Sequence, residues 1–323
     1  MAFDTNFIQT SVKEFPRTVC RGVGQVMFQD NMWTGLLFLA GIFWGAYQEG
    51  FPLVAWGALV GVLVSTLTGY ILRLPDKHGA NGLWGFNGVL VGCAFPTFLA
   101  ATPWMWIALV ICSALTTIAQ SGMDNVLSRW NLSSFTFPFV FCTWIFLLSS
   151  RLFAGFPAEY MGTPEFAHGE VGHISLKFGD LVVYWLRGIS QVFLIKSWVT
   201  GLFFLAGLAV SSWRAALWAA IGSAISLAIA LMWKAPGVDI ANGLYGFSAV
   251  LTAIALGATF CNFSWRAAIW AIFGTIATVF LQAAMNAFFA PMGLPTLTGP
   301  FCIGTWIFLL PAYKFFQPNT SSK

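Results

Sequence analysis

Charged residues are scarce in this chain. Lys and Arg number 15 and Asp and Glu number 11 among 323 residues, so 8% of the chain is charged, whereas 58% is hydrophobic and 17% is aromatic. Soluble globular proteins carry roughly 25% charged residues, and this shortage excludes water as the main solvent of the protein. The net charge of +4 is spread without any run of Lys or Arg, which excludes a nucleic-acid-binding surface.

Ionisable side chains are missing from the apolar segments in particular. We expect ten membrane-spanning segments, roughly at residues 30–47, 51–72, 82–100, 103–120, 135–150, 197–212, 215–233, 243–260, 267–289 and 300–313. None of their apolar cores contains Asp, Glu, Lys, Arg or His, and the histidines at 78, 168 and 173 fall in expected loops. Ion-coupled transporters need an ionisable relay at membrane depth, and enzymes need acid–base or metal-binding groups. The sequence therefore predicts a passive path for a neutral solute, with no cofactor and no catalysis.

Motifs of secreted and metal-binding proteins are absent too. The first 22 residues contain no apolar run of the kind found in signal peptides, so we expect the first membrane helix to act as the signal. The six cysteines show no CxxC or CxxH spacing and lie among apolar residues. We expect them to be small core residues.

The long apolar runs define the fold class. In bilayer hydrocarbon every backbone polar group must be paired internally, which leaves helices or a closed barrel. Barrel strands alternate polar and apolar residues over about ten positions, whereas these runs are continuous and approach the roughly 20 residues that a membrane helix needs. The sequence predicts an all-α polytopic protein of the cell (inner) membrane, surrounded by membrane lipid.

The second half of the chain repeats the first. Arg21–Gly41 (RGVGQVMFQDNMWTGLLFLAG) recurs 166 positions later as RGISQVFLIKSWVTGLFFLAG, and Asn81–Leu90 (NGLWGFNGVL) recurs 161 positions later as NGLYGFSAVL. Thr136–Leu148 (TFPFVFCTWIFLL) recurs 162 positions later as TGPFCIGTWIFLL. Three collinear matches of this kind indicate an internal duplication.

Five spanning helices per repeat is an odd number, so the two repeats are expected to be inverted relative to each other, with the site between them. We expect a first repeat at 1–150, an extracellular or periplasmic linker at 151–180 and a second repeat at 181–323. In each repeat one short segment, about 12–29 and about 181–195, is interrupted by Arg, Gly and Gln. These two segments are predicted to be re-entrant half-helices, with a surface amphipathic helix as the alternative.

The distribution of Lys and Arg predicts the orientation. If the N-terminus is cytoplasmic, ten of the fifteen Lys and Arg residues lie on cytoplasmic faces and five lie outside. The positive-inside rule then places both termini in the cytoplasm.

The polar residues of the apolar regions occur in matched pairs. Gln25 and Gln191 lie in the two short segments, and Thr136 and Thr298 each precede a proline by two positions. A proline within a helix frees an upstream carbonyl, so each threonine would add a hydroxyl beside unpaired carbonyl oxygens. Such a line of oxygens favours a neutral solute with several N–H donors.

The repeated decamer supplies the apolar part of the predicted site. Phe86 and Leu90 lie four residues apart, and Phe247 and Leu251 repeat this spacing, so each pair is expected on one helix face. Two such pairs would form a slot suited to a planar solute. The decamer glycines are expected to allow close helix approach, and Asn81 and Asn242 are expected to cap the helices that follow.

Together, the doubled N-G-L-x-G-F, T-x-P-F-x-x-x-T-W-I-F-L-L and R-G-x-x-Q-V segments resemble the urea transporter family over about residues 15–315. The resemblance implies a channel for facilitated diffusion of urea, two inverted repeats and a homotrimer with one pore per subunit. The short termini are more similar to those of bacterial members.

The resemblance also implies roles for particular residues. Thr136 and Thr298 would form the oxygen ladder together with Gln25 and Gln191, and the slot would be formed by Phe86, Leu90, Phe247 and Leu251, with Phe28 and Val192 as a further pair. The second decamer has Ser248 and Ala249 where the first has Asn87 and Gly88, so strict twofold symmetry is doubtful. A channel for a short amide, ammonia or water is the alternative function.

Overall fold

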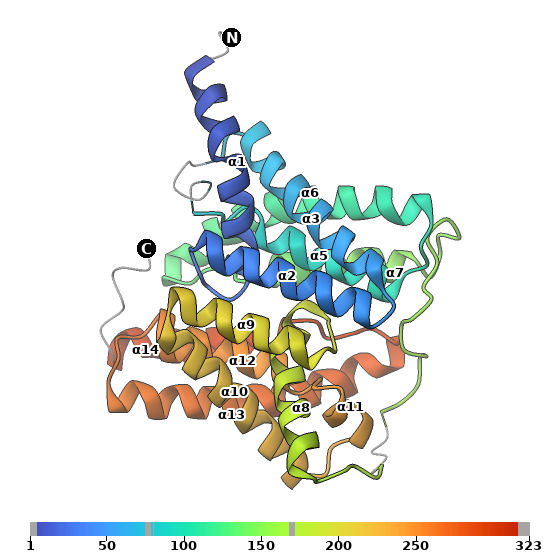
Figure 1. The fold of residues 1–323 in the computed structure, drawn as a ribbon, viewed down its shortest axis with the longest axis vertical. Helices are drawn as coiled ribbons and strands as arrows, with labels where there is room; N and C mark the ends of the chain where they lie inside the picture. Colours follow the sequence, from blue (N-terminus) through green and yellow to red (C-terminus); the bar gives the residue numbers. More distant parts are fainter. Residues whose placement is uncertain (1–4, 75–78, 80, 168–171, 316–323) are drawn as a thin grey trace.

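The computed structural model describes residues 5–74, 79, 81–167 and 172–315, and this part of the chain is all-helical (Figure 1). The first half contains α1 Thr5–Gln25, α2 Met32–Gln48, α3 Pro52–Ile71, α5 Phe86–Phe98, α6 Pro103–Leu127 and α7 Phe137–Ser149. The second half contains α8 Phe178–Ser190, α9 Trp198–Ser211, α10 Trp213–Met232, α11 Gly237–Ala241, α12 Gly246–Ile254, α13 Trp265–Phe289 and α14 Gly299–Phe315. Of the histidines expected in loops, positions 78 and 168 lie outside the described residues.

Every segment predicted to span the membrane contains a helix, but the helices differ in length. Four helical segments are long and apolar enough to cross a membrane by themselves: Pro52–Ile71, Pro103–Trp130, Trp213–Met232 and Trp265–Met292. A fifth span results if Phe178–Phe193 and Trp198–Ser211, which are bent by 72° at a short break, count as one. Four shorter apolar helices accompany them. The chain is a multi-pass membrane protein, and the count of ten spans stays a prediction.

Three predicted boundaries differ from the helices of the structure. The segment expected at 82–100 begins its helix only at Phe86, because Gly82 has a φ of +77° that a right-handed helix does not allow. The same holds for Gly243, with a φ of +76°, ahead of α12. The segment expected at 103–120 continues to Leu127, so this helix is longer than the apolar run alone indicated.

The two segments predicted to be re-entrant differ from each other. α1 begins at Thr5 and has 21 residues, so the helix starts well before the expected position 12. α8 has 13 residues and continues as a short 3-10 turn, Gln191–Phe193, before the chain turns into α9. In Figure 1 both α1 and α8 run at a steep angle to the helices that follow them. The bend between α8 and α9 is typical of a broken span or a re-entrant loop.

Helices α2 and α9 form the contact between the two halves, and they lie side by side in the middle of the molecule (Figure 1). The Thr34 hydroxyl donates to the carbonyl of Gly207 over 2.7 Å, and the Thr200 hydroxyl donates to the carbonyl of Gly41 over 2.8 Å. Since Thr200 and Gly207 are the repeats of Thr34 and Gly41, the contact is reciprocal. Thr34 near the start of α2 contacts Gly207 near the end of α9, and Gly41 contacts Thr200 near the start of α9, so the two helices run antiparallel.

A second reciprocal contact joins the halves near α7 and α14. The Trp144 indole N–H donates to the carbonyl of Pro295 over 2.8 Å, and the Trp306 indole N–H donates to the carbonyl of Ser133 over 2.9 Å. Each residue lies 162 positions from its counterpart, so here too the same contact is made twice.

Backbone conformation is duplicated along with the contacts. Among the described residues, the left-handed positions fall into five matched pairs, with Gly50 as the single position outside them: Phe28 and Leu194, Arg73 and Lys234, Gly82 and Gly243, Asn131 and Gly293, Phe135 and Leu297. Most non-glycine residues avoid this region. The repeat therefore extends to the unusual turns, including positions where the two sequences differ.

Candidate functional site

The two glutamines predicted for the site make the same hydrogen bond in each half. The side-chain amide of Gln25 donates to the backbone carbonyl of Asn81 over 2.8 Å, and that of Gln191 donates to the carbonyl of Asn242 over 2.8 Å. The expectation that these asparagines cap the following helices was wrong, because the N-cap positions of α5 and α12 are Gly85 and Tyr245. Each decamer turn instead offers a carbonyl that holds a glutamine at the end of α1 or α8.

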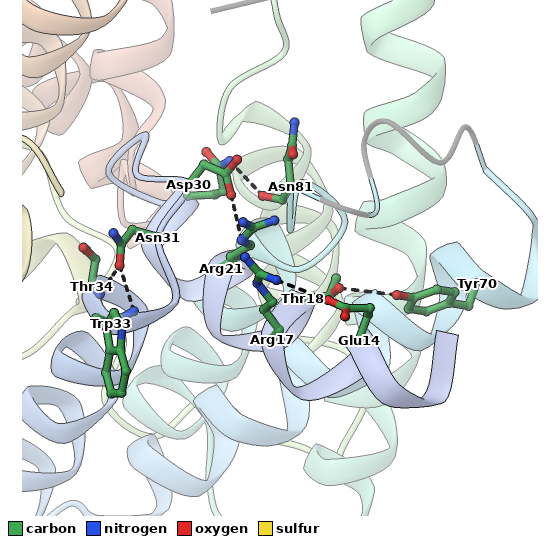
Figure 2. A network of polar contacts seen from close by, with 11 residues as sticks. Glu14, Arg17, Thr18, Arg21, Asp30, Asn31, Trp33, Thr34, Tyr70 and Asn81 are labelled. Atoms are coloured by element: carbon green, nitrogen blue, oxygen red, sulfur yellow. Dashed lines mark hydrogen bonds and ion pairs between the residues drawn. The ribbon is translucent and has the colours of Figure 1, made fainter. Parts of the chain in front are cut away.

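The surroundings of the α1 terminus are only partly repeated. Arg21 and Asp30 form an ion pair at 3.1 Å, and the Asn31 side chain caps α2 by accepting from the backbone N–H groups of Trp33 and Thr34 (Figure 2). In the second half the position of Asp30 is taken by Lys196. This ion pair is therefore specific to the first half.

The decamer glycines allow the close approach that was predicted for them. A Cβ on Gly82 would lie 2.4 Å from the backbone nitrogen of Gly22, and a Cβ on Gly243 would lie 2.5 Å from that of Gly188. Both distances are too short for any side chain. The turn before α5 therefore packs directly on the backbone of α1, and the turn before α12 packs in the same way on α8.

The two predicted threonines meet across the halves. The hydroxyl oxygens of Thr136 and Thr298 are 2.6 Å apart, and that of Thr136 also lies 3.4 Å from the sulfur of Cys302. Both threonines are buried. The predicted role of the nearby prolines was wrong. Pro138 and Pro300 lie in the first turns of α7 and α14, where a missing N–H costs no helical hydrogen bond and frees no carbonyl.

A cavity of about 230 Å³ adjoins the threonine pair. Four of the predicted site residues line it, namely Gln191, Val192, Phe247 and Thr298. Its wall also contains residues that the sequence prediction missed, among them Leu194, Leu244, Gln282 and Leu297. No Asp, Glu, Lys, Arg or His is among the described residues that line this cavity, so it suits a neutral solute.

The other predicted site residues do not line this cavity. Phe86, Leu90 and Leu251 are buried in the helix packing, and Phe28 packs against other aromatic rings. Gln25 and Thr136 make the contacts described above but do not line the cavity. The structure thus brings four of the ten residues together around one space, with Thr136 joined to them through Thr298.

The predicted pairing of Phe28 with Val192 does not match the duplicated backbone. Position 194, not 192, lies 166 residues after Phe28, and Phe28 and Leu194 share left-handed φ angles of 63° and 60°. Leu194 also lines the cavity. Applying the offset of the first repeated segment strictly would have identified it.

The two halves differ where Asn87 is replaced by Ser248. The Asn87 amide donates to Gln120 Oε1 over 3.0 Å, and its oxygen accepts from the backbone N–H of Phe139 over 3.1 Å. In the second half, the Ser248 hydroxyl and Gln282 Oε1 have no hydrogen-bond partner among the described residues. This confirms that the symmetry is not strict.

This difference gives a prediction for stability. Asn87→Ser is expected to lower the stability of the protein by about 2 kcal/mol, because it removes two buried hydrogen bonds of about 1 kcal/mol each. Thermal unfolding in detergent measures the loss. Ser248→Ala serves as the matched control in the other half, where the hydroxyl makes no bond. Equal destabilisation by both changes would contradict this account.

Comparisons with known proteins agree with these features. A family model described as urea transporter matches residues 17–313. The chain is 32% identical over 309 residues to urea transporter 1 of sheep (Ovis aries), which covers 95% of this chain and 79% of that protein. The values for urea transporter 1 of goat (Capra hircus) are the same, and urea transporter 1 of mouse (Mus musculus) is 31% identical over 311 residues, with coverage of 95% and 79%. With a family match over nearly its whole length, this chain belongs to the urea transporter family.

Proposed function

We propose that the protein conducts urea by facilitated diffusion through a path between its two halves. The observation that carries this proposal is the contact between the Thr136 and Thr298 hydroxyls, 2.6 Å apart, beside a cavity whose described wall is free of ionisable residues. Urea is planar and neutral and carries four N–H donors. Hydroxyl oxygens can accept from these donors, and each net hydrogen bond of about 1 kcal/mol offsets lost hydration without trapping the solute.

The proposed site contains the ten residues predicted from the sequence. Gln25, Gln191, Thr136 and Thr298 supply polar groups, and the flat or branched side chains of the slot exclude thick solutes and hydrated ions. The slot is formed by Phe28, Phe86, Leu90, Val192, Phe247 and Leu251. Support comes from the four members of this set that share one cavity wall.

We further propose that the two halves are inverted repeats, 1–150 and 181–323, joined by the linker 151–180. Two features support this arrangement. The matched helices α2 and α9 run antiparallel with reciprocal threonine bonds, and the matched tryptophans donate to each other's halves. Reciprocal contacts of this kind are expected across a twofold axis.

The placement in the membrane is proposed from charge and family alone. Cytoplasmic N- and C-termini follow from the excess of Lys and Arg on one side. A homotrimer with one path per subunit follows from the resemblance to the urea transporter family.

Solute uptake by proteoliposomes tests the proposed function. We expect rapid stopped-flow uptake of urea, slower uptake of glycerol, and a urea rate that proton and sodium gradients leave unchanged, because the described apolar helices offer no buried ionisable relay. Formamide and ammonia are measured alongside. A gradient-dependent urea rate would contradict passive conduction, and faster uptake of ammonia or water than of urea would favour a channel for another small neutral solute.

A further inference from the structure

Two spanning helices of the second half begin with the same five residues. The run SWRAA occurs at 212–216, where α10 starts, and again at 264–268, where α13 starts. In each case the serine is the N-cap, and its hydroxyl accepts from the backbone N–H three residues later. Both helical segments are long and apolar enough to cross a membrane. The tryptophan and arginine of each run therefore lie at the boundary between hydrocarbon and lipid headgroups.

The two helix starts lie on the same face of the protein. The guanidinium of Arg214 lies 5.3 Å from the ring centroid of Phe263, which directly precedes the N-cap of α13. Farther along both helices, the rings of Trp233 and Phe280 have centroids 5.3 Å apart. α10 and α13 therefore run in the same direction. We call the residues that meet at their starts the arginine patch: Trp213, Arg214, Phe263, Trp265 and Arg266.

Aromatic rings orient both guanidinium groups of the arginine patch. Arg214 lies over the Trp213 ring at 5.7 Å in addition to the Phe263 ring, and Arg266 lies over the Trp265 ring at 5.4 Å. A guanidinium stacked on a ring uses its flat face, so the N–H donors along its edge stay available to an anion. The three rings are 65–68% exposed, and tryptophans at such a boundary lie among lipid headgroups.

The arginine patch has a surplus of positive charge. No Asp or Glu occurs at 211–216 or 260–268. Among the residues that the structure describes, the two ion pairs join Glu14 to Arg17 and Arg21 to Asp30, so neither arginine of the patch is paired with a carboxylate. Both arginine residues are exposed. An anion that reached them would not compete with an acidic side chain.

The matched helices of the first half have no such patch. α3 and α10 both have 20 residues, and α6 and α13 both have 25. At the second position, where α10 and α13 have arginine, α3 has Leu53 and α6 has Trp104. In an inverted arrangement these starts lie on the opposite membrane face. The arginines thus distinguish one face from the other, and the distribution of Lys and Arg predicts that theirs is the cytoplasmic face.

We propose that the arginine patch binds the phosphate group of an anionic membrane lipid. The planar fork of a guanidinium binds phosphate oxygens with two parallel hydrogen bonds, and basic pockets between membrane helices on the cytoplasmic side bind anionic headgroups. A lipid fits the patch better than a soluble phosphate, because the three exposed rings give a lipid apolar contact and give a free ion none. This site is separate from the proposed urea path and uses none of its residues.

Titration with phosphatidylglycerol tests the site. Native mass spectrometry of the whole protein, released from detergent micelles, gives the dissociation constant of the most tightly bound lipid. In the variant Arg214→Gln with Arg266→Gln we expect this constant to rise by about 30-fold, which corresponds to about 1 kcal/mol for each arginine. Urea uptake by this variant in phosphatidylcholine vesicles is expected to equal that of the wild type, which shows that the variant folds.

Arg73→Gln with Arg129→Gln is the matched control. Both arginines belong to the face predicted to be cytoplasmic, and neither stacks on an aromatic ring among the described residues. This variant loses the same charge but keeps the arginine patch, so its dissociation constant should stay that of the wild type. Arg214→Lys keeps the charge but loses the planar fork, and we expect it to weaken binding by about fivefold.

Several results would overturn the lipid site. These are an unchanged dissociation constant in the Arg214→Gln, Arg266→Gln variant, an equal rise in the control variant, and equally tight binding of neutral phosphatidylcholine by the wild type. Displacement of phosphatidylglycerol by an equal concentration of glycerol 3-phosphate would show that the patch takes soluble phosphates instead of lipid. None of these results bears on urea conduction, whose failure would appear as absent urea uptake by the wild type.

Discussion

The double variant Thr136→Val, Thr298→Val is expected to lower urea flux by about 30-fold. Valine keeps the shape of threonine but removes the hydroxyl, so the two oxygens that meet at 2.6 Å between the halves are lost. Two hydrogen bonds of about 1 kcal/mol each raise the barrier by about 2 kcal/mol, and each ~1.4 kcal/mol corresponds to a factor of ten in rate. Stopped-flow uptake into proteoliposomes measures the change.

The control for this experiment lies on the same helix. Thr143 is fully buried in α7, and among the described residues its hydroxyl makes no hydrogen bond to the second half. Thr143→Val should therefore fold and conduct urea at close to the wild-type rate. If the double variant kept wild-type flux, or if Thr143→Val lost as much, the threonine pair would not be part of the conducting path.

The variant Gly35→Ala is expected to have the largest effect on stability. A Cβ at Gly35 in α2 would lie 1.7 Å from the backbone carbonyl oxygen of Cys20 in α1, and its counterpart Gly201 would place one 2.3 Å from the carbonyl oxygen of Leu186. Backbone atoms cannot move aside as a side chain can, so α1 must separate from α2. Overpacking of this kind costs about 3 kcal/mol or more, and we expect a lower Tm in detergent together with loss of urea flux.

Gly122→Ala is the matched control for Gly35→Ala. Gly122 also lies within a helix, α6, but a Cβ there would have no neighbouring atom within 4 Å. We expect an unchanged or slightly raised Tm, because alanine favours helix formation over glycine. A Tm for Gly35→Ala that equals the one for Gly122→Ala would show that α1 does not depend on this close approach.

Much of the fold could be predicted because the second half of the sequence repeats the first. The repeated segments located the pairs Gln25 and Gln191 and Thr136 and Thr298, and the apolar runs located the helices. The offset is what made Thr136 and Thr298 candidates, and the structure joins their hydroxyls.

Other features depend on contacts that a linear pattern does not show. Asn81 and Asn242 accept hydrogen bonds from the glutamine side chains through their backbone carbonyls. The capping prediction rested on the asparagine side chain, so it could not indicate this contact. The prolines start helices instead of interrupting them, because the preceding turn, with Phe135 at φ 51°, ends just before. Phe28 packs against Phe260 and Phe301, which lie far away in sequence, and among 33 phenylalanines no local signal identifies these contacts.

The antiparallel contact of α2 with α9 has a consequence for how the protein can move. In alternating access, one half rocks against the other around a central site. Here such rocking would break two buried hydrogen bonds between hydroxyl and carbonyl groups. It would also separate the Phe38 and Phe204 rings, whose centroids lie 4.9 Å apart and which pack closely on Gly207 and Gly41. We therefore expect the two halves to stay in contact along α2 and α9 while a solute passes between them, without a cycle of rigid-body motion.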